Sequence, residues 1–413
     1  MEFGIRQLTR AVFSELRHWQ NRITEVTMKI LKIIGAVVAV LVAATLLTGH
    51  AYLWGGIRET YFRGWKNANI DDIEFRDIRT IAAPDSAQAW IAAPVWGYEL
   101  SADEQAWHET YMSASFLVLH GDTLLFERYW NGFDEQTVSN SFSACKSIVA
   151  LAVGLAVTEG RVDVQNELAT YLPRFAGDAG KGLTVEEVLQ MRSHIPFGED
   201  YDNPFGFMAK AYYRGELEDL VAPYRVESEP GTEWLYQGGN TLLLGEIMRS
   251  LDERTLSDWV AAGLWQPMGA EHDAYWAVDG QEPGSIERCF AAYYATARDF
   301  ARFGKLMNHR GNWNGTQLID STYMNEMVTP ISERSTACDA GHYGYQIWLG
   351  TTADGLEFSC MEGLRGQFVV SVPALDLVVV RTGFKKNEQK DGPLPSEVQR
   401  IVEMGRRVLD AAR

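Results

Sequence analysis

The order of apolar and polar positions predicts strands toward both ends of the chain's main part and helices in between. Residues 116–129 contain two apolar runs on either side of Gly121-Asp122, which is typical of a β-hairpin. We therefore expect an α+β fold, in which an antiparallel sheet is flanked by terminal helices and carries an inserted all-helical lobe at about residues 165–290. The later strand-like runs are residues 343–349, 357–360, 367–372 and 377–382.

One helix is predicted to lie in the core. Between Ala144 and Val157 the only charged residue is Lys146, so the segment has no polar face. A helix that is apolar all round is buried inside a large domain. Gly160 supplies its C-terminal stop, and a second apolar helix is expected over residues 240–251.

Polar residues mark where three other helices begin. Residues 184–187 read Thr-Val-Glu-Glu, a capping box for a short helix, and Thr296 is the expected cap of another. Residues 396–412 have the spacing of an amphipathic terminal helix. Its first four residues, from Ser396 to Gln399, are predicted to form a further capping box.

An uncharged run from Ile33 to Gly56 is long enough to span a bilayer. Lys29 and Lys32 precede it, so the positive-inside rule places the N-terminus in the cytoplasm. The main domain would then lie on the periplasmic, extracytoplasmic side of the inner membrane, held by a single span. Alternatively, the run is a signal peptide that is cut near residues 49–51, and the domain is secreted.

These features divide the chain into four parts. Residues 1–28 form a short cytoplasmic segment with apolar positions at helical spacing. Because basic residues follow Met28 as they do at the start of a signal sequence, translation beginning there is an equal alternative. The anchor or signal covers residues 29–54, a polar approach segment covers 55–95, and the main domain covers 96–413.

Composition and charge narrow the classes of function. The net charge of −18 argues against nucleic acid as a partner. The four cysteines show no Cys-x-x-Cys spacing and no His-Glu-x-x-His occurs, so we expect neither a metal site nor a cofactor. Cys145 lies in the predicted buried helix, where we expect its thiol to be unreactive and to pack in the core. The sequence does not decide whether two of Cys289, Cys338 and Cys360 form a disulfide, and it does not fix the oligomeric state.

The buried helix begins with a pair of residues that can do chemistry. Ser143 falls at its start, and Lys146 lies one turn further on the same face. Burial and the helix N-terminus both disfavour a charged ammonium, and a neutral amine can take the proton of a serine and make it a nucleophile. The alternative is an N-cap serine beside a lysine whose head reaches solvent.

Five motifs in order favour the chemical interpretation. Together they resemble serine hydrolases related to the class C β-lactamases, and most closely the branch of 6-aminohexanoate-dimer hydrolases and esterases. The resemblance extends over residues 100–410, nearly all of the part beyond the membrane segment. The motifs are Ser143–Lys146, Leu183–Ser193, Pro230–Tyr236, Ala295–Asp299 and Gly363–Gln367.

The resemblance implies a β-lactamase/transpeptidase-like fold and a role for each matching residue. Ser143 would be the acylated nucleophile and Lys146 its proton-sharing partner. Tyr236 would act as base in acylation and help to activate water in deacylation, with its pKa lowered by the adjacent lysine ammonium. The backbone N–H groups of Ser143 and Gln367 would form the oxyanion hole. The alternative for Tyr236 is an aromatic residue that packs in a turn.

Two departures from the family pattern bear on the substrate. Leu364-Arg365-Gly366 stands where β-lactamases and penicillin-binding proteins have Lys-Thr-Gly, which binds a substrate carboxylate. Gln237-Gly238 follows the tyrosine where those proteins commonly have x-Asn. The resemblance implies substrate contacts for Tyr201, Arg365 and Gly366. Arg365 would act as a substitute carboxylate clamp, or else be a solvated strand residue.

We therefore expect an exported, membrane-anchored serine hydrolase that cleaves an ester or amide bond of a small molecule through an acyl-enzyme on Ser143. A β-lactamase or peptidoglycan peptidase is the first alternative, which the missing Lys-Thr-Gly disfavours. The second is a membrane-anchored, penicillin-recognising sensor that is acylated without turnover.

Overall fold

The computed structural model describes the chain except for residues 1, 94–96, 335–339, 388 and 392–393. It divides into two compact units, Met1–Arg58 and Glu59–Arg413, and each is described by itself. Cys338, one of the cysteines left open for a disulfide, lies outside the described residues. Cys145, Cys289 and Cys360 are buried and free.

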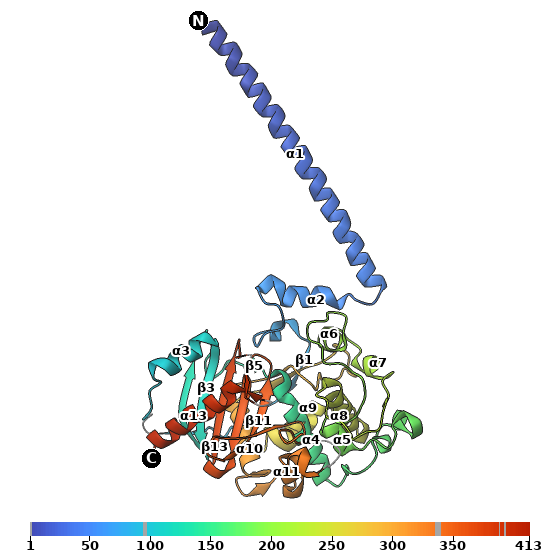
Figure 1. Cartoon of the computed structure of the whole chain (residues 1–413), viewed down its shortest axis with the longest axis vertical. Helices are drawn as coiled ribbons and strands as arrows, with labels where there is room; N and C mark the ends of the chain where they lie inside the picture. Colours follow the sequence, from blue (N-terminus) through green and yellow to red (C-terminus); the bar gives the residue numbers. More distant parts are fainter. Residues whose placement is uncertain (1, 94–96, 335–339, 388, 392–393) are drawn as a thin grey trace. The chain divides into compact units, whose positions relative to one another are not determined.

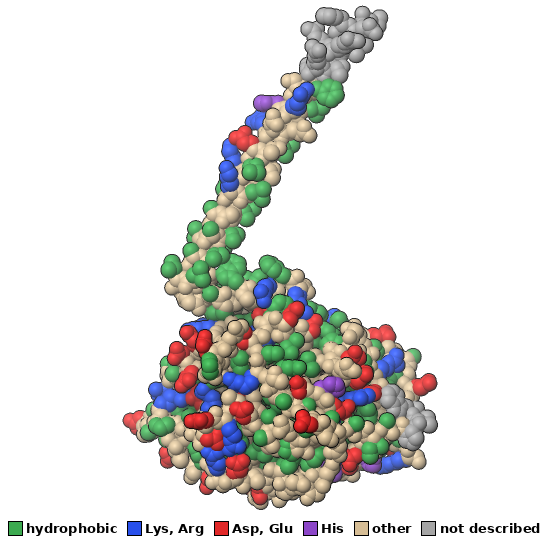
Figure 2. All heavy atoms as spheres, turned by 180° about the vertical axis from the view of Figure 1, so that it is seen from behind, with side chains coloured by type: hydrophobic (Ala, Val, Ile, Leu, Met, Phe, Trp, Pro, Cys, Tyr) green, Lys and Arg blue, Asp and Glu red, His purple; other side chains and the backbone are tan. Residues whose placement is uncertain are grey.

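The first unit is dominated by one long helix. Helix α1 (Glu2–Leu47) runs without a break through the predicted cytoplasmic segment and the predicted span, and α2 (Tyr52–Glu59) follows it. Residues 13–47 are long and apolar enough to cross a membrane. Hydrophobic side chains surround the part of α1 nearer to its C-terminus, and charged side chains gather nearer to its N-terminus (Figure 2). A signal sequence shares these features, so α1 is a candidate span.

The second unit is built on a seven-stranded sheet with the order β10-β11-β12-β13-β3-β4-β2 (Figure 1). The expected hairpin is present as β3 and β4, and β13, from the later part of the chain, pairs with β3. The short strand β2 runs parallel to β4, so the sheet is mixed and not purely antiparallel as expected. Its strands are β2 (Ile91–Ala92), β3 (Ser113–His120), β4 (Thr123–Tyr129), β10 (Trp348–Thr351), β11 (Glu357–Gly363), β12 (Gln367–Val372) and β13 (Leu377–Gly383).

Helices cover both faces of this sheet because successive strand residues point to opposite sides. Val379 of β13 belongs to the core shared with α13 (Ser396–Ala411), while Val378 and Val380 belong to the core on the face where α10 (Ala297–Asn308) packs. Glycines let both helices approach closely. A Cβ on Gly304 of α10 would lie 2.5 Å from Val378, and one on Gly405 of α13 would lie 2.4 Å from Val379. Helix α3 (Ala102–Thr110) adds Trp107 to the α13 face.

A second, four-stranded sheet was not predicted. Its order is β1-β6-β7-β5, from β1 (Ile78–Ile81), β5 (Ser139–Asn140), β6 (Ala274–Ala277) and β7 (Tyr293–Ala295). Strand β6 lies within the region expected to be all-helical. Strands β1 and β2 come from residues 55–95, so this expected approach segment contributes strands to both sheets. Strands of two to four residues are too short to show a period of two in the sequence.

The predicted buried helix is α4 (Cys145–Thr158), which packs on α8 (Gly238–Leu251) and α9 (Leu256–Val260). Figure 1 shows these helices gathered to one side of the strands. The remaining helices are α5 (Val185–Leu189), α6 (Phe207–Tyr213), α7 (Leu217–Val221), α11 (Ser321–Met327) and α12 (Ile331–Arg334). Two small hairpins pair β8 (Asn312–Trp313) with β9 (Thr316–Gln317) and β14 (Lys390–Asp391) with β15 (Leu394–Pro395).

Most predicted helix starts are confirmed. The side chain of Thr184 forms a capping box with Glu187, and Thr296 caps α10. The capping box predicted at Ser396 is wrong, because Pro395 occupies the N-cap position and Ser396 is already helical. The strand predicted over residues 343–349 is present only from Trp348 onward.

Candidate active site

Ser143 lies in a tight turn between the second sheet and the buried helix. Strand β5 ends at Asn140, and the 3₁₀ turn η3 (Phe142–Ala144) carries the serine directly before α4. The N-cap of α4 is Ala144, so Ser143 is not the capping serine of the alternative interpretation. Phe142 has a φ of +46°, a conformation that is uncommon for a non-glycine residue. The turn thus presents Ser143, partly exposed, in front of the helix.

Lys146 points at the serine and not at solvent. Its side chain is 1% exposed, and Nζ lies 2.8 Å from Oγ of Ser143. Burial lowers the pKa of Lys146, and the carboxylate of Glu199 partly opposes this shift. A buried amine that binds its proton weakly and touches a serine hydroxyl is placed to accept the serine proton.

Tyr236 comes from the loop before α8 and completes the group. The centroid of its ring lies 4.7 Å from Nζ of Lys146, and the ring packs near Tyr343 and Trp348. Burial raises the pKa of Tyr236 well above its usual value, as does Glu199, while a hydrogen bond with Ser143 lowers it. The sequence analysis expected the lysine ammonium to lower this pKa, whereas burial shifts it in the opposite direction.

Glu199 belongs to the site although the sequence analysis did not single it out. One of its carboxylate oxygens accepts the backbone N–H of Gly238 at 2.6 Å, at the start of α8. The other accepts the hydroxyl of Tyr201. The carboxylate also raises the pKa values of Lys146, Tyr201 and Tyr236. Its spacing of two from Tyr201, in an acidic and aromatic loop, was the only signal in the sequence.

Strand β12 lies against the turn that carries Ser143. Gln367 begins β12 and pairs with Gly363 of β11, and the turn η3 packs on both strands. The Gln367 side chain is fixed by the carbonyls of Leu364 and Gly383, at 2.9 and 2.8 Å. This places the residue predicted for the oxyanion hole on a rigid strand beside Ser143. Its role as donor stays a prediction.

Arg365 and Gly366 turn the chain between β11 and β12, with φ values of +65° and +82°. The guanidinium of Arg365 donates to the backbone carbonyls of Asn67, Ala68 and Phe384 at 2.8–3.1 Å. Arg365 is therefore neither a solvated strand residue nor directed at a substrate carboxylate; it holds the segment at residues 67–68. A Cβ on Gly366 would lie 2.1 Å from the guanidinium of Arg381, so a glycine is required here for Arg381 to pack against the turn.

A cavity of about 90 Å³ opens beside Ser143. Two of its tyrosines direct their hydroxyls at carboxylates, because Tyr201 donates to Glu199 and Tyr212 donates to Asp72. Most of the lining side chains therefore present ring or aliphatic carbon to a ligand. The lining residues are Asn67, Ala68, Phe142, Ser143, Tyr201, Met208, Ala209, Tyr212, Tyr213, Phe290, Ala291 and Leu364.

Other potentially reactive groups do not compete with Ser143. Burial raises the pKa of Cys145 to about 12, so its thiol is inert at neutral pH. Among the residues that the structure describes, no group of three or more His, Cys, Asp or Glu side chains is arranged to hold a metal ion.

Comparisons with known proteins identify the family of the chain. The β-lactamase family profile matches residues 103–397. The 6-aminohexanoate-dimer hydrolase of Paenarthrobacter ureafaciens is 28% identical over 295 residues, which cover 67% of this chain and 74% of that protein. A candidate D-alanyl-D-alanine carboxypeptidase of Escherichia coli strain K12 is 22% identical over 190 residues, covering 40% of this chain and 43% of that protein.

Solved structures share the fold. A candidate 6-aminohexanoate-dimer hydrolase from Bacillus anthracis superposes with a TM-score of 0.67 at 22% identity, covering 83% of this chain and 92% of that one. A family VIII carboxylesterase gives a TM-score of 0.57 at 19% identity and covers 80% and 100% of the two chains. Both likenesses concern the arrangement of the strands and helices.

Proposed function

Because the chain belongs to the β-lactamase family, a family of hydrolases, we propose that it cleaves an ester or amide of a small molecule through an acyl-enzyme on Ser143. The observation that carries the proposal is the buried amine of Lys146, 2.8 Å from the hydroxyl of Ser143. Surface lysines rarely lose a proton at neutral pH, whereas a desolvated one does so readily.

In acylation, the amine of Lys146 takes the proton of Ser143 while Oγ attacks the carbonyl carbon of the substrate. The backbone N–H groups of Ser143 and Gln367 donate hydrogen bonds to the developing oxyanion. When the carbon–leaving-group bond breaks, the protonated phenol of Tyr236 gives its proton to the leaving group and regains one from Lys146. In deacylation, a water molecule replaces the leaving group and the proton transfers run in the reverse direction.

The cavity beside Ser143 favours a substrate whose reacting carbonyl carries an uncharged, apolar group. Its walls are mostly ring and aliphatic carbon, and the Arg365 guanidinium donates to three backbone carbonyls. A β-lactam or a peptidoglycan stem brings a carboxylate close to the scissile bond, and this site offers no free cation in the Lys-Thr-Gly position. These contacts support an ester or amide hydrolase over a β-lactamase or peptidoglycan peptidase.

We further propose that α1 is an uncleaved anchor and that the hydrolase unit faces the extracytoplasmic side of the inner membrane. Support comes from the apolar residues 13–47 and from Lys29 and Lys32 ahead of the uncharged run. Membrane fractionation with N-terminal sequencing tests this: a soluble mature chain that begins near Tyr52 would show a cleaved signal instead.

Active-site labelling tests the assignment of Ser143. A fluorophosphonate should label the wild-type protein and a panel of p-nitrophenyl esters and anilides should be turned over steadily, and Ser143→Ala should lose both. Ser147→Ala is the matched control, since Ser147 lies one turn along α4 and hydrogen-bonds the carbonyl of Gln346 at 2.6 Å. Labelling of Ser143→Ala at the wild-type rate would overturn the assignment, and a stoichiometric burst that then stops would favour the sensor.

A further inference from the structure

Asp72 is a fully buried carboxylate that the proposed chemistry does not use. It lies in the segment that the sequence analysis treated as an approach to the domain, and its side chain is 0% exposed. Each of its oxygens accepts two hydrogen bonds. The donors are Asn140 Nδ2 at 3.0 Å and Tyr294 OH at 2.7 Å on Oδ1, and Tyr212 OH at 2.8 Å and Arg76 at 3.2 Å on Oδ2.

Asn140 connects this carboxylate to the turn that carries Ser143. Its amide nitrogen donates to Asp72, and its amide oxygen accepts the backbone N–H of Phe142 at 2.8 Å. Its own backbone N–H donates to the carbonyl of Ile70 at 2.9 Å. Because a carboxylate only accepts hydrogen bonds, Asp72 fixes which end of the amide faces it. The oxygen of Asn140 must then face Phe142.

The hydrogen bond to Phe142 falls at the strained position of the turn. Phe142 holds a φ of +46°, which persists only where the surroundings impose it. Ser143 is the next residue, and its Oγ must stay 2.8 Å from Nζ of Lys146 for proton transfer. If the amide of Asn140 rotated, the N–H of Phe142 would lose its acceptor, and the turn would be free to relax toward ordinary φ values.

We propose that Asp72 and Asn140 are positioning residues, which hold the strained turn so that Ser143 stays in line with Lys146. Neither touches the reacting atoms; Asp72 acts through Asn140, and Asn140 acts through Phe142. The inference rests on the proposed function of Ser143. It gives the expected approach segment a part in positioning the nucleophile, and the same carboxylate also fixes Tyr212, which lines the cavity beside Ser143.

The test measures the kinetics of covalent labelling, which needs no known substrate. For Asp72→Ala, the maximal rate of fluorophosphonate labelling should fall by about 100-fold, the loss attributed to misplacing a reacting group by roughly 1 Å. Because Tyr212 also loses its acceptor, the concentration that gives half-maximal rate reports separately on the cavity, and the positioning role is judged from the maximal rate alone. A purely structural role would instead lower the melting temperature and leave the labelling rate of the folded protein intact.

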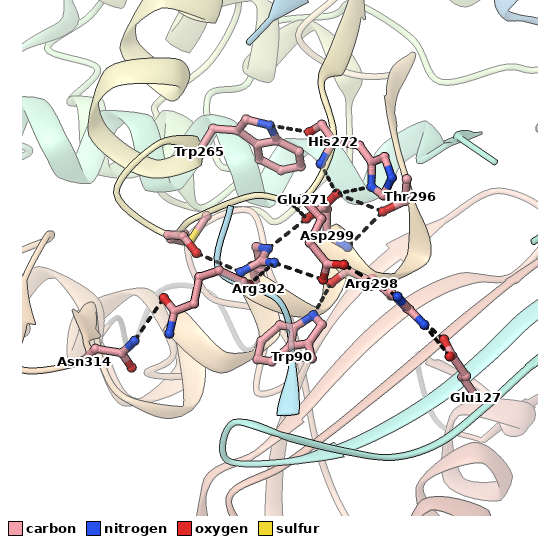
Figure 3. Close-up of polar contacts among 12 residues, drawn as sticks. Trp90, Glu127, Trp265, Glu271, His272, Thr296, Arg298, Asp299, Arg302 and Asn314 are labelled. Carbon is pink, nitrogen blue, oxygen red and sulfur yellow. Dashed lines mark hydrogen bonds and ion pairs between the residues drawn. The ribbon is translucent and has the colours of Figure 1, made fainter. Parts of the chain in front are cut away.

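Asp299 offers a matched control. It too is a fully buried carboxylate, and it accepts the backbone N–H groups of Glu271 and His272 at 2.8 and 3.1 Å and Nε of Arg302 at 2.8 Å (Figure 3). None of the partners drawn there belongs to the site. Asp299→Asn should therefore lower the melting temperature and leave the labelling rate unchanged, when both are measured well below that temperature.

The proposal would be overturned by an Asp72→Ala protein that melts lower, as Asp299→Asn does, yet labels within threefold of the wild-type rate. Should Asp72→Ala fail to fold, Asp72→Asn decides by the same criterion, because its amide retains one acceptor oxygen and the shape of the side chain. Normal labelling of the wild type at Ser143 alongside unaffected Asp72 variants would sink this inference and leave the proposed function standing.

Discussion

Gly363 lies where the main sheet closely approaches the turn that carries Ser143. It is the last residue of β11 and pairs with Gln367. A Cβ at this position would lie 2.1 Å from the carbonyl oxygen of Ser141 and 3.0 Å from Cβ of Gln367. Because Cβ contacts shorter than 3.0 Å essentially do not occur, Gly363→Ala must push the turn away from the strand by about 0.9 Å.

This displacement sets the expected loss of activity. A misplacement of roughly 1 Å at a reacting group costs about 100-fold in rate, equivalent to about 2.7 kcal/mol of transition-state stabilisation. We therefore expect kcat to fall by about two orders of magnitude, with a smaller change in KM because the cavity beside Ser143 keeps its walls. Overpacking should also lower the free energy of unfolding by about 1–3 kcal/mol.

The assay is kcat with a p-nitrophenyl ester, normalised by the fraction of protein that a fluorophosphonate titrates, together with urea unfolding. Gly284→Ala is the control, since a Cβ there meets no atom within 4 Å and the backbone has no positive φ. A Gly363→Ala protein that is folded and keeps kcat within threefold of wild type would refute the argument that the Ser141–β11 contact positions Ser143.

Further predictions concern the pH profile of kcat/KM. The acidic limb should report protonation of Lys146, since only its neutral amine accepts a proton, and the alkaline limb should report ionisation of Tyr236. Tyr236→Phe should lower turnover by about 10²–10⁴-fold and lose the alkaline limb; near-normal turnover would show that the tyrosine only packs. Glu199→Gln removes a charge that raises the pKa of Lys146, so the acidic limb should move to lower pH, and an unmoved limb would contradict the electrostatic role of Glu199.

The sequence was most informative where a signal is local. The all-apolar segment after Ser143 predicted the buried helix, and the spacing of three placed Lys146 beside the serine, as found. Tyr236 entered through its motif, and the structure brings it to the same amine. The hairpin and the caps at Thr184 and Thr296 are likewise set by neighbouring residues.

Long-range pairings were not accessible in the same way. Asp72 and Asn140 are 68 residues apart, and nothing in the polar segment around Asp72 indicates that its carboxylate is buried. Strand β1 pairs with β6 almost 200 residues later, and a strand of four residues carries no distinctive pattern. The contacts of Arg365 show the same limit: its place in the motif suggested contact with a substrate, whereas two of its three partners are backbone carbonyls of a segment nearly 300 residues away.

The protonation states of Lys146 and Tyr236 show how burial can reverse an argument from neighbours. In water, a lysine and a tyrosine side by side would each stabilise the charged form of the other, which is an ammonium beside a tyrosinate. Burial disfavours the charged form of each group, so it lowers the pKa of the lysine and raises that of the tyrosine. The amine beside Ser143 therefore binds its proton less tightly, and the phenol of Tyr236 binds its proton more tightly, than either would in water. The proposed roles, with Lys146 accepting a proton and Tyr236 donating one, follow from desolvation of the pair, which only the burial of both groups in the fold reveals.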